Sequence, residues 1–304
     1  MISKETGFTP EEAGYDAGRL QYLNQYFEKL IHQKKIISAN YCMARDGKIF
    51  ADNAFGKLSY REEDDRPLQT DTIQRIASIT KLFCTVAIWQ LAEDGLLRVN
   101  QRVGEIIEEF NEKPFYDITI AHLLTHTSGL QPDPGCFENK YYQSAWDFIA
   151  EDRGKNWIAA ALKSGMRTKP GEEWAYCSFG FVILGEVIAR ISGEAAEEYI
   201  INHIIKPCGL KDTGFDRERK EIAGNIPNEH VEKYIDSILK DTLEKNEEES
   251  FWNKIPNTGG GLYSTAYDLC RFGTMLQQGG TIDGTRILGR KAIEKMTTLY
   301  TASH

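Results

Sequence analysis

The hydrophobic positions near the start of the chain follow two different periods. Residues 16–33 carry a leucine or phenylalanine every three or four positions, a spacing that predicts an amphipathic helix. Two apolar stretches, 36–44 and 49–55, then flank Asp46-Gly47, a dipeptide that favours a tight hairpin turn. The chain is therefore predicted to begin with one helix and an antiparallel pair of strands.

Helical spacing dominates the middle of the chain, from about residue 67 to residue 215. One apolar helix is predicted to follow Ser78 and to end at Gly95, and another begins near Ser178 and ends at Gly193. Glycine suits both ends because it readily adopts the left-handed conformation that closes a helix. Most of the apolar surface in this part is therefore predicted to lie on helices.

The later part of the chain changes character twice. Residues 218–249 are rich in charge, which predicts either a solvated excursion or an exposed helix pair that covers a cleft. Thr265 and Asp268 then have the spacing of a capping box at the start of a helix. The sequence contains no evident internal repeat or low-complexity segment.

Ser78-Ile79-Thr80-Lys81 carries the clearest catalytic signal. Three residues are almost one helical turn, so the Ser78 hydroxyl and the Lys81 amine are predicted to lie on one helix face, with Ser78 in the first turn. A serine hydroxyl is a weak nucleophile that needs a neighbouring base, which a neutral lysine can supply. The pattern alone also fits a solvated lysine near a capping serine, so the rest of the chain has to decide.

A second segment, Lys169-Pro170-Gly171 through Tyr176-Cys177-Ser178, predicts a turn, a short extended stretch and a helix start. With S-x-x-K and Y-x-S in this order, the chain resembles the serine hydrolases of the class C β-lactamase and penicillin-binding-protein superfamily, which includes β-lactamase-related esterases and D-amino peptidases. Segments 123–130 (LLTHTSGL) and 259–265 (GGGLYST) resemble two further hallmark stretches of that superfamily.

The resemblance implies an α+β fold of the β-lactamase/transpeptidase type. An antiparallel sheet flanked by helices would come from about residues 1–66 and 216–304, and an inserted, mostly helical part from about residues 67–215. Together they would form a single β-lactamase-like unit over 1–304. The Ser78 helix would lie at the junction of the two parts, where ligand clefts commonly form.

The same resemblance implies roles for four residues. Ser78 would attack a carbonyl to form an acyl-enzyme, while Lys81 and Tyr176 would share the proton transfers as catalytic residues. Ser178 falls where relatives often have asparagine, so it is expected to bind Lys81 or the substrate; its competing role is to cap the following helix. No metal and no cofactor are expected, although His122 and His126 lie one helical turn apart, a spacing that two metal ligands can have.

The third superfamily motif, Lys/His-Thr-Gly or a glycine-rich equivalent, has no clear match. Asn257-Thr258-Gly259 is superficially similar, but Pro256 precedes it and more glycines follow, which predicts a glycine-rich turn. The expectation is therefore that the C-terminal strands are missing. The sheet would then have an exposed edge through which the chain could self-associate.

Composition narrows the partners. The 304 residues carry a net charge of -9, which argues against nucleic acid and anionic membranes. Six cysteines without a C-x-x-C pair predict buried free thiols, with Cys177 singled out as the neighbour of Tyr176. No apolar run could span a bilayer and no signal-peptide core is evident, so a cytoplasmic location is expected.

The leading hypothesis is a serine hydrolase acting through a Ser78 acyl-enzyme on small ester or amide substrates, including β-lactam or D-amino peptide substrates. An esterase or small amidase is favoured over a dedicated β-lactamase because no export signal is evident and because Ser178 replaces asparagine. The alternative from another class is a catalytically impaired, truncated homologue that acts as a binding protein.

Overall fold

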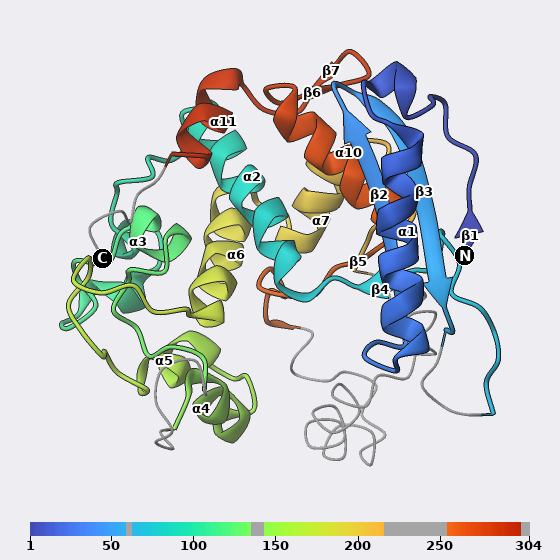
Figure 1. Ribbon diagram of the computed structural model, residues 1–304. Coiled ribbons are helices and arrows are strands. Elements are labelled where there is room, and N and C mark those ends of the chain that lie inside the picture. Colours follow the sequence, from blue (N-terminus) through green and yellow to red (C-terminus); the bar gives the residue numbers. More distant parts are fainter. Residues whose placement is uncertain (59–62, 135–142, 216–253, 299–304) are drawn as a thin grey trace. The chain divides into compact units, whose positions relative to one another are not determined.

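A computed structural model describes residues 1–58, 63–134, 143–215 and 254–298 (Figure 1). The whole of the charged segment 218–249, and Cys136, lie outside the described residues. The chain divides into two compact units. The sheet unit comprises the described residues of Met1–Arg75, Pro207–Glu248 and Tyr263–Arg286, and the helical unit those of Ile76–Lys206, Glu249–Leu262 and Ile287–His304. The domain boundaries that the sequence predicted, at about residues 66 and 215, stay predictions.

The sheet unit is built on three antiparallel strands in the order β1-β3-β2. Strand β1 is Ile2–Ser3, β2 is Ser38–Arg45 and β3 is Lys48–Gly56, so the predicted hairpin is confirmed. Asp46 and Gly47 have φ angles of 50° and 81°, the positive values that a two-residue hairpin turn requires at both positions. The predicted self-association through a sheet edge stays a prediction.

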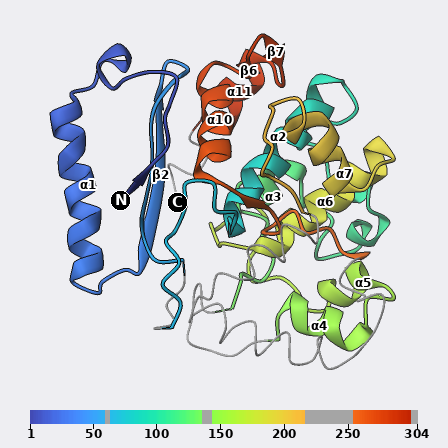
Figure 2. The ribbon, with the colours of Figure 1, turned by 90° about the vertical axis from the view of Figure 1, so that its right-hand side faces the viewer.

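Helix α1 (Ala17–His32) matches the amphipathic helix predicted over 16–33. It packs on one face of the sheet, and α10 (Ala266–Gln277) packs on the other, so that the sheet lies between the two helices (Figure 2). Phe27 of α1 contacts Phe55 and Tyr41 of the strands, with ring centroids 5.5 and 5.9 Å away. Aromatic side chains of the helix and of the strands therefore pack against one another.

The start of α10 differs from the predicted capping box. Thr265 does cap the helix by accepting a hydrogen bond from the Asp268 main-chain N–H at 3.2 Å. The Asp268 carboxylate instead accepts hydrogen bonds from the Asp212 N–H and the Thr213 hydroxyl, at 2.8 and 2.9 Å. Asp268 is buried, so it ties a distant loop to the helix rather than completing the box.

Short elements complete the sheet unit. They comprise the 3₁₀ helix η1 (Glu11–Ala13) and two small antiparallel pairs: β4 (Gln74–Arg75) with β5 (Tyr263–Ser264), and β6 (Thr281–Ile282) with β7 (Thr285–Arg286).

The helical unit is organised around two apolar helices, α2 (Thr80–Glu93) and α6 (Ser178–Ser192), which pack against each other. Helix α6 ends at Gly193 in the left-handed conformation, as predicted. Around them lie η2 (Ala77–Ile79), η3 (Val103–Glu105), η4 (Glu108–Asn111), α3 (Ile120–Leu124), α4 (Ala145–Asp152), α5 (Trp157–Leu162), α7 (Ala196–Ile200), a π-helical turn (Ile201–Ile205) and α11 (Arg290–Met296).

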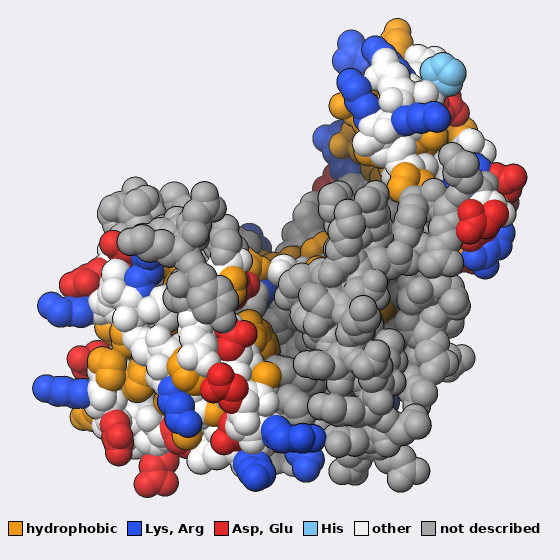
Figure 3. Space-filling model, turned by 90° about the horizontal axis from the view of Figure 1, so that it is seen from below, with side chains coloured by type: hydrophobic (Ala, Val, Ile, Leu, Met, Phe, Trp, Pro, Cys, Tyr) orange, Lys and Arg blue, Asp and Glu red, His pale blue; other side chains and the backbone are white. Residues whose placement is uncertain are grey.

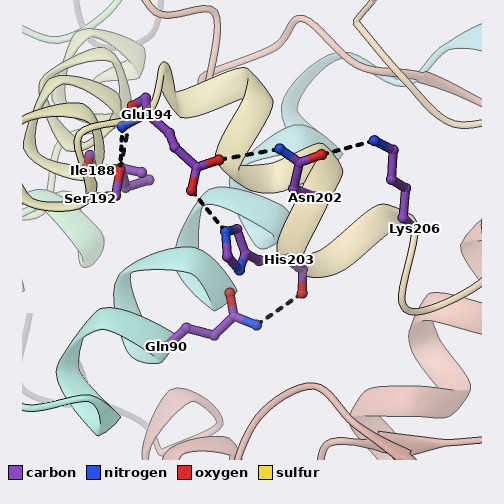
Figure 4. A network of polar contacts seen from close by, with 7 residues as sticks. All are labelled: Gln90, Ile188, Ser192, Glu194, Asn202, His203 and Lys206. Carbon is purple, nitrogen blue, oxygen red and sulfur yellow. Dashed lines mark hydrogen bonds and ion pairs between the residues drawn. The ribbon is translucent and has the colours of Figure 1, made fainter.

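A polar network joins the end of α6 to the π-helical turn and to α2 (Figure 4). Glu194 accepts hydrogen bonds from His203 at 3.0 Å and Asn202 at 3.2 Å, and Gln90 of α2 donates to the His203 carbonyl at 3.2 Å. The side chain of His203 also stacks on Tyr199, with centroids 4.2 Å apart. These hydrogen bonds join the π-helical turn to α2 and to the residue that follows the end of α6.

The face of the molecule drawn in Figure 3 carries described side chains of both charges. On the face in Figure 3, Lys and Arg side chains are interspersed with Asp and Glu side chains. Within the part of the chain that the structure describes, no helix is both long and apolar enough to cross a membrane.

Candidate active site

Ser78 lies in η2, immediately before α2, so the prediction that it occupies the first turn of the long helix is off by less than one turn. The preceding residue, Ala77, has a φ angle of 43°, a left-handed conformation that costs energy for a residue with a side chain. The Thr80 hydroxyl donates to the Ala77 carbonyl at 2.7 Å and accepts from the Leu262 N–H at 3.1 Å. These bonds hold the strained turn and leave Ser78 exposed.

Lys81 is one turn further on and is almost fully buried, with 6% of its surface accessible. Its Nζ donates to the Ser78 hydroxyl at 3.1 Å, the Ser178 hydroxyl at 3.1 Å and the Gly259 carbonyl at 2.7 Å. The structure therefore confirms the predicted Ser78–Lys81 contact and fixes Nζ from three sides.

Tyr176 completes the contacts of the serine. Its hydroxyl donates to the Ser78 Oγ at 2.7 Å, and its ring lies 4.9 Å from the Lys81 Nζ. The extended stretch that carries it is held by main-chain bonds on both sides, from Ala175 N–H to the His126 carbonyl and from Asp133 N–H to the Tyr176 carbonyl. The structure thus brings together the three residues that the sequence predicts to be catalytic.

Ser178 is the first residue of α6, and Cys177 occupies the capping position without a side-chain hydrogen bond. The capping alternative for Ser178 is therefore wrong. Its hydroxyl accepts from Lys81 and donates to the Asp133 carboxylate at 2.6 Å, while its main-chain N–H donates to the same carboxylate at 2.8 Å. The predicted contact of Ser178 with Lys81 is confirmed.

His126 lies behind the tyrosine, with the ring centroids 4.4 Å apart. Its Nδ1 accepts a hydrogen bond from the Cys177 N–H at 3.1 Å, so that nitrogen carries no proton. Burial, and next the nearby Lys81 charge, lower the pKa of His126 to about 4. The imidazole is therefore neutral near pH 7 and adds no second cation to the site.

His122, the other histidine of the pair, also accepts a hydrogen bond from the main chain. The Nδ1 of His122 accepts from the Thr119 N–H at 3.2 Å in a reciprocal cap at the start of α3. Among the residues that the structure describes, no three His, Cys, Asp or Glu side chains are grouped so that they could hold a metal ion.

Two residues of this site were missed by the sequence prediction. The turn predicted at 257–261 is confirmed by bonds from the Gly260 and Gly261 N–H groups to the Asn257 carbonyl, but the Gly259 carbonyl is also a ligand of Lys81. A Cβ at Gly259 would lie 3.2 Å from a main-chain oxygen of α6, so the glycine permits this close approach. No sequence pattern marks Asp133 as a residue of the site.

Cys177 is 2% exposed, and burial raises its pKa to about 12. A thiol that is both covered and protonated is a poor nucleophile. The buried-thiol prediction is confirmed for Cys84, Cys177 and Cys208, whereas Cys42 and Cys270 are partly exposed.

The chain also matches a family of known proteins. A family model described as Beta-lactamase matches residues 23–303. The chain belongs to the beta-lactamase family. Penicillin-binding protein 4* of Bacillus subtilis (strain 168) is 28% identical over 267 residues, which cover 85% of this chain and 56% of that protein. The chain thus spans little more than half the length of this relative.

Solved structures show the same fold. The octameric penicillin-binding protein homologue from Pyrococcus abyssi is 25% identical, with a TM-score of 0.66 over 92% of this chain and 60% of that one. A family VIII carboxylesterase has a TM-score of 0.70 at 20% identity, over 98% of this chain and 77% of that one. The predicted α+β fold of the β-lactamase/transpeptidase type is therefore confirmed, as is the resemblance on which it rested.

Proposed function

We propose that this protein is a serine hydrolase in which Ser78 forms an acyl-enzyme with an ester or amide substrate. The observation that carries the proposal is the position of the Ser78 Oγ, which lies 3.1 Å from the Lys81 Nζ and 2.7 Å from the Tyr176 hydroxyl. One exposed hydroxyl therefore has two proton-transfer groups within hydrogen-bond reach, which is the arrangement that an activated nucleophile requires.

The reaction then follows in two halves. In the first, the Ser78 oxygen bonds to the substrate carbonyl carbon while its proton passes to the Tyr176–Lys81 pair, and the same pair returns a proton to the departing alcohol or amine. In the second, water attacks the acyl carbon, gives a proton to the pair, and Ser78 leaves with a proton restored to its oxygen. Each half begins and ends with the same number of protons on the pair.

The substrate class rests on family membership. The name of Penicillin-binding protein 4* supports a compound with a β-lactam-like amide, and the fold is shared with a carboxylesterase. We favour small esters and amides over a strict preference for β-lactams, since Ser178 stands where relatives often have asparagine. A short-chain p-nitrophenyl ester and a chromogenic cephalosporin separate the two; rapid turnover of the cephalosporin alone would reverse this order.

A fluorophosphonate probe tests the mechanism. The wild-type protein should become labelled on Ser78, located by mass spectrometry of the labelled peptide, and Ser78→Ala should not be labelled. Ser192→Ala is the matched control, because its hydroxyl donates to the Ile188 carbonyl at the far end of α6. A folded wild-type protein that neither labels nor hydrolyses esters or amides would refute the proposal and favour the binding-protein alternative.

A further inference from the structure

Three hydrogen bonds join the loop residue Asp133 to the segment 176–178. Its Oδ1 accepts from the Ser178 N–H at 2.8 Å, its Oδ2 accepts from the Ser178 hydroxyl at 2.6 Å, and its own N–H donates to the Tyr176 carbonyl at 2.9 Å. The residue lies between Pro132 and Pro134, whose rings restrict the main chain around it. The carboxylate is thus held in one place.

The contact with Ser178 decides the direction of a hydrogen bond. An ionised carboxylate can only accept, so the single proton of the Ser178 hydroxyl is directed to Asp133. The lone pairs of the same oxygen then face the Lys81 Nζ, which lies 3.1 Å away. Ser178 is therefore an acceptor for Lys81 because Asp133 takes its proton.

We propose that Asp133 is a positioning residue that acts through Ser178 on Lys81. By fixing Ser178 as an acceptor, it holds the Lys81 Nζ in the position from which it reaches the Ser78 hydroxyl. The inference rests on the proposed function, because a contact with Lys81 affects a rate only if Lys81 takes part in catalysis.

Asp133 could instead have a purely structural role, which experiment can distinguish from the positioning role. A carboxylate beside the first N–H groups of α6 also stabilises that helix, as an N-terminal acidic residue does. In that case Asp133 would affect stability, and its effect on the rate would not depend on the Ser178 hydroxyl. The two roles therefore differ in whether removing Ser178 abolishes the effect of changing Asp133.

The experiment compares Asp133→Asn, Ser178→Ala and the double variant. Asparagine keeps the shape and can still accept from the Ser178 N–H, but its amide must donate toward the Ser178 oxygen. We expect the fluorophosphonate labelling rate of Ser78 and the kcat for a p-nitrophenyl ester to fall about 10- to 100-fold in each single variant, the range for one charge-assisted hydrogen bond. KM should change less than kcat.

The double variant should be no slower than Ser178→Ala within about threefold, because residues that act as a unit are not additive. Asp147→Asn is the matched control: the Asp147 carboxylate accepts from the N–H and hydroxyl of Ser144 at the start of α4, at 2.7 and 2.8 Å. This change should leave both rates at the wild-type level.

Two results would overturn the inference while leaving the proposed function intact: Asp133→Asn labelled at the wild-type rate, or losses that multiply in the double variant. A wild-type protein that is not labelled would refute the proposed function and this inference together. Urea unfolding of each variant shows whether a slower rate only reflects unfolded protein. If Asp133→Asn does not fold, Asp133→Glu, which keeps the charge but moves the oxygens, replaces it in the same comparison.

Discussion

The half-buried His126 is expected to make the stability of the helical unit depend on pH. Its pKa is lowered from 6.5 to about 4, first by burial and then by the charge of Lys81. The unfolded chain therefore binds a proton between pH 6.5 and pH 4 that the folded protein does not bind. The contribution of His126 to the free energy of unfolding is therefore fully present above pH 6.5, and it is lost as the pH falls from 6.5 to 4.

The size of the effect follows from the two pKa values. Between pH 7 and pH 4.5 a histidine with these values lowers the free energy of unfolding by about 2 kcal/mol. His126→Asn removes this term, and the asparagine oxygen can still accept from the Cys177 N–H that now binds Nδ1. The wild-type protein should therefore lose about 2 kcal/mol more than the variant over this range.

Urea unfolding at several pH values between 4.5 and 7 measures the difference. Trp174 is a suitable fluorescent probe because its ring lies 6.1 Å from that of His126. His122→Asn is the control: burial also lowers the pKa of His122, yet that variant keeps His126 and should retain most of the wild-type loss. Protonation of carboxylates is common to all three proteins and cancels in the comparison. Parallel stability curves for wild type and His126→Asn would refute the reasoning.

Four further outcomes are expected. Gly185→Ala should lower the free energy of unfolding in urea by about 1–3 kcal/mol, because its Cβ would lie 2.5 Å from Pro256. Gly273→Ala on α10 is the control: its Cβ meets no atom within 4 Å, so this change should be neutral or stabilise the protein by up to about 1 kcal/mol. Gly259→Ala should lower kcat about tenfold by displacing the lysine's carbonyl acceptor, and should also destabilise the protein in urea, because its Cβ would lie 3.2 Å from the Ser178 carbonyl oxygen. Cys177→Ala should keep at least half of the activity, and peptide mapping should find Cys177 unmodified after iodoacetamide treatment of the native protein at pH 8. Lys81→Met should raise the pKa of His126, measured by NMR titration, but leave it below 6.5 because burial remains.

The features that the sequence predicted correctly depend on short separations along the chain. The hairpin at Asp46-Gly47 needs two adjacent residues with positive φ, and the Ser78–Lys81 contact needs only one helical turn. Tyr176 came from the family resemblance rather than from spacing, since it lies 98 residues from Ser78. Local periodicity therefore predicted the helices and strands, whereas the family resemblance predicted which distant residues meet in the site.

The features that were missed or wrong depend on contacts between distant segments. Asp133 is 45 residues from Ser178, and Gly259 is 178 residues from Lys81, so no local pattern marks either as part of the site. The local pattern also misled at Ser178 and Asp268, both of which looked like helix caps. In each case a distant partner competes for the same polar atoms, and the tertiary hydrogen bond takes the place of the local one.

The hydrogen bonds of the site link the buried Lys81 to the exposed Ser78. The Lys81 Nζ has three hydrogen-bond acceptors around it, and the Ser178 proton is directed to Asp133. The Tyr176 proton is directed to the Ser78 oxygen, which therefore receives hydrogen bonds from two donors. The Gly259 carbonyl holds the Lys81 Nζ directly, and Asp133 holds it through the Ser178 hydroxyl, so the contact with Ser78 is one of three that fix its position. The exposed serine therefore contacts a lysine whose position is set by segments far from it in the sequence.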